Sequence, residues 1–212
     1  MARKPADQSV SREDIIKAAA DVLKDKGYDA TTMKDIAARV DLTAASLYHH
    51  FKNKDFLLLA VIEQGLAQAI SIIEPIVQSD CDASTKLRQM IQTHVRAITR
   101  NPAVGAALVF EIKSLMSVTT AGRGNGNRQE YIERRDRFFQ KRDYFERMFR
   151  DVVTEGIANG EFRQVDSGIA VKSMLGAQNW VGVWFKLDGR LNGDQIADML
   201  SDIFLTSLLV RD

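Results

Sequence analysis

The sequence predicts an all-α protein with a small N-terminal helical domain and a larger C-terminal one. The 212 residues are 45% hydrophobic and 27% charged, a globular composition that excludes a disordered or collagen-like chain. Prolines number three, and apolar residues recur at intervals of three and four over long stretches. No stretch alternates β-branched and polar residues between turn signals, so strands are not expected.

Three helices with recognisable N-caps are expected in the first 50 residues. Each begins after a Ser or Thr, and in two of them an Asp three residues later completes a capping-box pattern. A glycine ends the first helix, and a tight turn separates the second from the third. These caps, their partners, the glycine, the turn and the last helical residue are Ser11 with Asp14, Gly27, Thr32 with Asp35, Val40-Asp41-Leu42, Thr43 and His50.

Six further helices follow. A long one should begin at Asn53-Lys54-Asp55 and run toward Pro75. The other five are expected at 84–100, 102–118, 129–159, 167–186 and 194–209, with a loop at 119–128. In the last helix, the stripe from Ile196 to Leu208 is wide enough to bury, and we expect it to pair with the preceding helix, containing Gly168, Gly176 and Gly182, across a dimer interface.

Charge, cysteine content and hydropathy exclude several classes of protein. The net charge of +1 indicates no partner, although residues 123–150 hold nine basic and five acidic side chains, a net charge of +4. We expect neither a membrane span nor a secretory signal, and therefore a cytoplasmic protein. Cys81, the single cysteine, fits a reducing compartment and is expected to be an apolar filler.

Residues 32–51 have the sequence pattern of a helix-turn-helix motif. A capped helix, a tight turn and a second capped helix follow one another, and such a unit holds its second helix rigidly enough to enter a DNA major groove. Its apolar seam is expected to consist of Ile36, Ala37, Val40, Leu42, Leu47 and Phe51.

The motif and its flanks resemble the TetR family of bacterial transcriptional repressors. The matching pattern runs from Ile15 through Gly27-Tyr28, Thr31-Thr32-Met33, Ile36-Ala37, Val40, Leu42, Leu47-Tyr48-His49-His50-Phe51 and Lys54 to Leu57. One departure is Asp41, where members often have Gly. Because Asp tolerates turn conformations, we expect little change in the turn.

The resemblance implies which residues contact DNA. Thr32 would touch a backbone phosphate, Tyr48, His49 and Lys54 would contact phosphates or the groove, and Thr43 and Ser46 would begin a recognition helix that also exposes Ala44 and Ala45. Tyr48 could instead be a core aromatic residue. His49 and His50 are not expected to hold a metal, because adjacent helical side chains diverge.

The segment from Tyr144 to Leu209 is similar to TetR relatives that govern fatty-acid, aromatic-acid and steroid catabolism and respond to acyl-CoA thioesters. This resemblance implies a ligand site around Asn179, Trp180 and Trp184. To that site we add Phe110 as an apolar wall residue, and from the basic stretch Arg137 and Arg142, whose guanidinium groups suit coenzyme A phosphates. Three alternatives stay open. The Trp pair could pack in the core or a dimer interface, the arginines could lie on a solvated helix face, and His94 could line the cavity or be an ordinary histidine.

We therefore expect a homodimeric, ligand-responsive repressor with a DNA-binding domain at residues 1–52 and a ligand-binding and dimerisation domain at 53–212. It would bind a pseudo-palindromic operator and an acyl-CoA effector, with no cofactor, no metal and no membrane partner. One alternative is a repressor that senses a hydrophobic drug-like ligand. A helical-bundle enzyme is the other, and against it the sequence shows neither a metal set nor a nucleophile and base.

Overall fold

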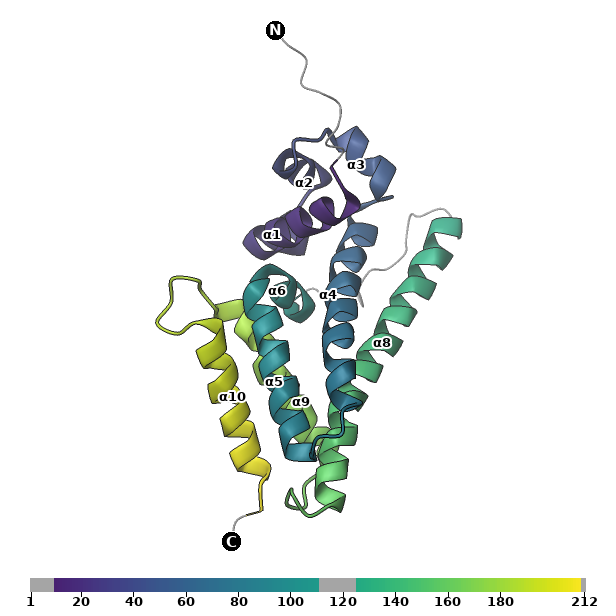
Figure 1. The fold of residues 1–212 in the computed structure, drawn as a ribbon. Coiled ribbons are helices and arrows are strands. Elements are labelled where there is room, and N and C mark those ends of the chain that lie inside the picture. The colour runs from purple at the N-terminus through teal and green to yellow at the C-terminus, as the bar shows by residue number, and fades with distance from the viewer. Residues whose placement is uncertain (1–9, 111–124, 211–212) are drawn as a thin grey trace.

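A computed structural model of the protein describes residues 10–110 and 125–210 and consists of helices joined by short connections (Figure 1). The helices of this part of the chain are α1 (Arg12–Ala30), α2 (Met33–Arg39), α3 (Ala44–His50), α4 (Lys54–Val77), α5 (Ala83–Arg100), α6 (Pro102–Phe110), α8 (Asn125–Ala158), α9 (Ser167–Trp184) and α10 (Gly193–Leu208). The described residues contain no strand beyond an isolated bridge between Phe162 and Leu209. The all-α prediction is confirmed.

All three predicted N-caps are present. Ser11 and Thr32 each form a complete capping box, and the Thr43 side chain accepts a hydrogen bond from the Ser46 amide. Gly27 interrupts α1 with φ of 72° and ψ of 169°, a conformation that is essentially restricted to glycine. Asp41 has φ of 54°, so the turn between α2 and α3 uses the left-handed conformation that Asp tolerates.

Several helix ends differ from the expectation. The helix predicted at 129–159 begins at Asn125, because a first helical turn makes few internal hydrogen bonds and accepts weak helix formers. The long fourth helix continues through Pro75 to Val77, and α9 ends at Trp184. The predicted helix at 102–118 is described to Phe110, and the rest of it, with positions 119–124 of the predicted loop, lies outside the described residues.

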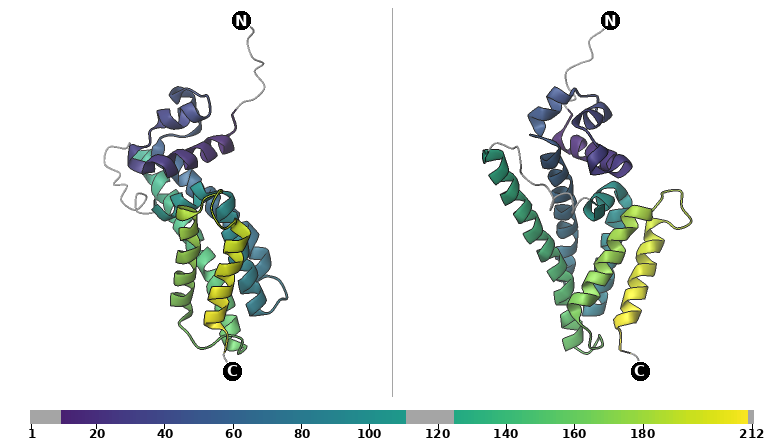
Figure 2. Two further views of the ribbon diagram at one scale, coloured as in Figure 1. Left: turned by 90° about the vertical axis from the view of Figure 1, so that its left-hand side faces the viewer. Right: turned by 180° about the vertical axis from the view of Figure 1, so that it is seen from behind.

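The helices form two groups along the molecule. The α1, α2 and α3 helices lie together at the N-terminal end, and α4 descends from them into a bundle with α5, α8, α9 and α10 (Figures 1 and 2). The α4 helix packs against α1, α5, α6 and α8, so it contacts both groups. By length and composition alone α4 could cross a membrane, but 56% of its most apolar window is buried within the fold.

The expected dimer stripe is divided between two environments. Ile196 and Leu208 are buried, and α10 packs extensively against α5, so these two residues of the stripe belong to the core of one subunit. Gly182 also faces inward, because a Cβ there would lie 2.9 Å from the carbonyl carbon of Gly105 on α6. The expectation that Ile196, Leu208 and Gly182 lie in a dimer seam was wrong, because packing within one subunit already buries them.

Candidate nucleic-acid interface and ligand cavity

The α2 and α3 helices are held in a fixed orientation by a small apolar seam. Ile36, Ala37 and Leu47 are at most 1% exposed, and the short Ala37 side chain allows α3 to approach closely. The Leu42 amide donates to the Ala37 carbonyl at 2.9 Å, which closes the turn. The predicted seam is confirmed, with Val40 and Leu42 packed at its edge.

The outer face of α3 carries the side chains that the sequence predicted for DNA contact. Thr43, Ala45, Tyr48 and His49 are exposed, and Ala44 and Ser46 are partly exposed. Tyr48 is 53% exposed, which argues against the alternative that it is a core aromatic residue. The predicted residues of α3 therefore share one accessible surface, which we call the recognition face.

Thr32 is the N-cap of α2, the helix that packs against α3. Its hydroxyl donates to the Asp35 carboxylate at 2.8 Å and accepts from the Asp35 amide. Hydrogen bonds from Lys26, and then from Thr32, lower the pKa of Asp35 to about 2. Asp35 is therefore ionised at neutral pH and keeps the capping box formed.

Lys54 has a structural role in addition to the predicted phosphate contact. Its ammonium donates to the Tyr28 carbonyl at 2.7 Å and lies 4.2 Å from the centroid of the Tyr28 ring. The neighbouring Asp55 carboxylate accepts a hydrogen bond from the Tyr28 hydroxyl. These contacts, which we call the Tyr28 latch, fasten the end of α1 to the beginning of α4.

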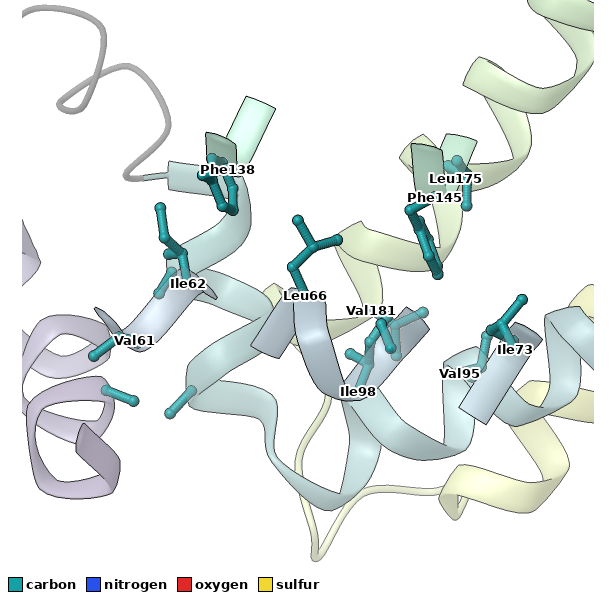
Figure 3. Close-up of a cluster of buried hydrophobic side chains, with 14 of the residues drawn as sticks. Val61, Ile62, Leu66, Ile73, Val95, Ile98, Phe138, Phe145, Leu175 and Val181 are labelled. Atoms are coloured by element: carbon teal, nitrogen blue, oxygen red, sulfur yellow. The ribbon is translucent and has the colours of Figure 1, made fainter. Parts of the chain in front are cut away.

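A cavity of about 280 Å³ lies inside the bundle, between α4, α5, α8 and α9. Four apolar side chains of its walls, Leu66, Phe138, Phe145 and Leu175, come from three of these helices and are drawn in Figure 3. Polar and charged side chains also line this inner cavity: His94, Arg142, Glu146, Lys172 and Asn179. Arg142 and Lys172 are exposed, and they make no ion pair within the described part of the chain, so they offer positive charge at the cavity mouth.

A second, more open space lies between α1, α4 and α8, with a volume of about 530 Å³. We call it the cationic groove, because its lining includes the basic residues Arg12, Arg134, Arg137 and Lys141 against the acidic Glu13 and Glu63. Arg134 forms a bidentate ion pair with Glu63, at 3.0 and 2.9 Å from its Nε. Phe138 forms part of the wall of both the groove and the inner cavity.

The residues predicted for ligand binding are divided among three places. Asn179 and Arg142 line the inner cavity, and Arg137 lines the cationic groove. Trp180 and Trp184 lie outside the cavity and are 50% and 48% exposed, because the helical turn that directs Asn179 inward directs these side chains outward. The Phe110 side chain is outside the described residues.

Several cavity residues were missed by sequence reasoning. Leu66, Ala69, Phe138, Phe145, Lys172 and Leu175 line the cavity, and His94 had been left open. The spacing of Phe138 and Phe145 by seven residues on a polar helix was a usable signal of an inward face. No comparable local signal marks the other wall residues named here, which come from α4, α5 and α9.

A group of three or more His, Cys, Asp or Glu side chains able to hold a metal is absent from residues 10–110 and 125–210. His49 and His50 are both exposed. Cys81 is a partly exposed free thiol.

Two protein-family models match the chain. Residues 15–61 match the model described as bacterial regulatory proteins, tetR family, and residues 80–208 match the tetracyclin repressor-like C-terminal domain. The transcriptional repressor KstR2 of Mycolicibacterium smegmatis is 26% identical over 202 residues, which are 95% of this chain and 92% of KstR2.

Two solved structures extend the comparison. The TetR family regulator PfmR from Thermus thermophilus is 28% identical, with a TM-score of 0.76 over 91% of this chain and 97% of PfmR. AibR in complex with isovaleryl coenzyme A and operator DNA is 26% identical, with a TM-score of 0.73 over 91% of this chain and 96% of AibR.

Proposed function

The chain belongs to the TetR family of transcriptional regulators, and from this premise we propose that it is a homodimeric repressor whose release from a pseudo-palindromic operator is triggered by an acyl-CoA thioester. The single observation that carries the effector assignment is the cationic mouth of the inner cavity beside the cationic groove. KstR2 is named a repressor, and AibR was solved with both an acyl-CoA and operator DNA.

DNA binding is supported by the recognition face. A short, rigidly seated helix with exposed Thr43, Tyr48 and His49 suits insertion into a major groove. A dimer presents two such helices, which explains the expected pseudo-palindrome. We place the DNA-binding domain at residues 1–52 and the ligand-binding and dimerisation domain at 53–212.

Dimerisation is supported by an apolar surface on α9 and α10. Ile169, Trp180 and Trp184 on α9, with Met199 and Ile203 on α10, are between 48% and 65% exposed. The two helices also border a common groove of about 300 Å³ that includes Ile169 and Phe204. Covering this surface with the same surface of a second subunit would form a four-helix interface.

The two spaces suit the two chemically different ends of an acyl-CoA. The inner cavity, with Leu66, Phe138, Phe145 and Leu175 in its walls, would take the acyl group, for which each buried methylene contributes about 0.8 kcal/mol. Arg142 and Lys172 at the mouth, with Arg137 in the groove, would hold phosphates. Trp180 and Trp184 take no part in this site.

The effector would act on DNA binding through α4. Leu66 and Ala69 of α4 line the cavity, while the Tyr28 latch fastens the other end of α4 to α1. A ligand that fits only one position of α4 would therefore shift the spacing of the two recognition helices. A coupling free energy of about 1 to 3 kcal/mol is typical of such a transition.

The test begins with an operator selected from random DNA duplexes by the purified full-length protein. Short-chain acyl-CoAs, the matched free acids and free coenzyme A are then titrated against the protein–DNA complex by fluorescence anisotropy at fixed salt. We expect release by a thioester and not by the matched acid. The Arg142→Ala variant should need about ten-fold more thioester, as expected for a lost charged hydrogen bond.

Arg147→Ala is the matched control, because Arg147 is exposed on the same helix and is not part of the cavity lining. Release by free acids or neutral hydrophobic compounds, with no response to any thioester, would contradict the proposal. That result would favour the alternative of a repressor that senses a hydrophobic drug-like ligand.

A further inference from the structure

A buried polar pair that the proposed thioester site does not use consists of His94, which lines the inner cavity, and Gln178 behind it. The His94 Nδ1 lies 3.0 Å from the Gln178 Oε1, and both side chains are at most 4% exposed. The Gln178 Nε2 donates to the Met174 carbonyl at 3.3 Å, which fixes the orientation of the amide. Because Gln178 presents its oxygen to the imidazole, the hydrogen of the ring must be on Nδ1.

The other ring nitrogen is consequently a hydrogen-bond acceptor. Burial of His94 lowers its pKa to about 4, with the Gln178 hydrogen bond raising it by a smaller amount, so the ring is neutral at physiological pH and carries one N–H. His94 lines the cavity, and its Nε2 has no hydrogen-bond partner among the described residues. Because Nδ1 is directed at Gln178, which is not part of the cavity lining, Nε2 is the ring nitrogen that can present a lone pair to the cavity, whose walls include Leu66, Phe138 and Phe145.

From this geometry we propose that the buried end of the effector carries a hydroxyl group that donates a hydrogen bond to the His94 Nε2. The inference rests on the proposed effector cavity and narrows its ligand to a hydroxylated acyl group. His94 is the specificity-determining residue, and Gln178 is a positioning residue that sets its tautomer. A purely apolar acyl group would leave the acceptor dehydrated and unpaired, which disfavours binding.

The hydrogen bond between His94 and Gln178 also joins α5 to α9. This structural role uses Nδ1 alone and makes no demand on the ligand. The two roles are separable, because the structural role predicts no preference between ligands that differ only in a hydroxyl group.

Phenol and toluene are suitable probes, because they have nearly the same shape and differ by a hydroxyl in place of a methyl group. Their dissociation constants are measured on the full-length protein by chemical-shift titration, for the wild type and for His94→Phe, which keeps an aromatic ring without nitrogen. We expect the variant to shift the ratio of the two constants by about ten-fold or more against phenol. A ratio that agrees within about two-fold between the two proteins overturns the proposal.

A measurement on the wild type keeps the test independent of the stability of the variant. The two nitrogens of neutral imidazole have well separated ¹⁵N chemical shifts. We expect the His94 Nε2 to have the shift of an unprotonated nitrogen and to move when phenol, but not toluene, is added. A protonated Nε2, or the same response to both probes, contradicts the assignment.

A third comparison separates this inference from the proposed function. The CoA thioesters of 3-(4-hydroxyphenyl)propionate and 3-phenylpropionate are compared for release of operator DNA, and we expect the hydroxylated thioester to act at a lower concentration. If neither thioester acts while phenol keeps its advantage, the proposed effector class fails and the role of His94 stands. If the two thioesters release DNA at equal concentrations, the proposed role of His94 is contradicted and the proposed effector class is not.

Discussion

At the scale of single residues, burial of His94 makes the stability of the fold depend on pH. Its pKa is about 4 in the folded protein, against about 6.5 in an unfolded chain. Between these values the unfolded chain binds a proton that the folded chain does not. The contribution of His94 to the free energy of unfolding is therefore complete above pH 6.5 and is lost as the pH falls toward 4.

Because His94 takes up a proton only in the unfolded chain, we expect the free energy of unfolding to fall by about 2 kcal/mol between pH 7 and pH 4.5. Urea denaturation of wild type and His94→Phe at both pH values measures it, and the variant should lose correspondingly less on acidification. His49→Phe removes an exposed imidazole and should keep the wild-type pH dependence. Identical pH dependence in wild type and His94→Phe would show that the imidazole is not held neutral.

Tyr48 is a second residue for which exposure matters, because only an exposed side chain can contact DNA. Its position on the recognition face predicts that Tyr48→Ala lowers operator affinity by about five-fold or more, since a single specific contact contributes about 1 to 3 kcal/mol. Fluorescence anisotropy at fixed salt measures the affinity. Tyr144→Ala is the matched control, because Tyr144 is an exposed tyrosine on α8 whose hydroxyl donates to Glu74. Equal affinities of the two variants would remove Tyr48 from the interface.

At the scale of the helices, two glycines of α9 have opposite surroundings. A Cβ on Gly182 would lie 2.9 to 3.0 Å from backbone atoms of Gly105 and Ala106, whereas one on Gly176 would meet nothing within 4 Å. The helices α6 and α9 therefore cross at near backbone contact, and this contact holds one wall of the bundle next to the cavity.

Gly182→Ala should lower the free energy of unfolding by about 1 to 3 kcal/mol, because backbone cannot move aside as a flexible side chain can. Gly176→Ala should raise it by up to about 1 kcal/mol, since alanine is the better helix former. Urea denaturation followed by circular dichroism measures both variants. A destabilised Gly176→Ala together with an unaffected Gly182→Ala would contradict the packing of α9.

At the scale of the whole molecule, the apolar surface of α9 and α10 predicts the oligomeric state. Ile203 is 60% exposed, so Ile203→Arg should leave the subunit folded while placing an unpaired charge in the dimer interface. Sedimentation velocity should show a monomer at a concentration where the wild type is a dimer. Gln140→Arg, at an exposed position on α8, is the control and should remain dimeric. A dimeric Ile203→Arg variant with native helicity would place the interface elsewhere.

Local sequence patterns were enough to predict the order of the helices, the seam of the helix-turn-helix motif and the exposed residues of α3. Ser11, Thr32 and Thr43 cap their helices through partners three residues away, and a 3.6-residue period specifies which face of a helix is buried. These interactions act within one or two turns, so the local sequence is sufficient to show them.

Which residues line the cavity and which face outward depends on how the helices pack, and local patterns could not predict it. Leu66, His94, Phe145 and Lys172 belong to four helices and meet only after those helices pack. Trp180 was expected beside Asn179 in the ligand site, yet successive helical residues point about 100° apart, so the neighbours of α9 determine which one is enclosed. The apolar stripe of α10 shows the same limit. Its spacing predicts that the stripe is buried but not which partner covers it, and in the structure α10 packs against α5 with Ile196 buried and Ile203 exposed.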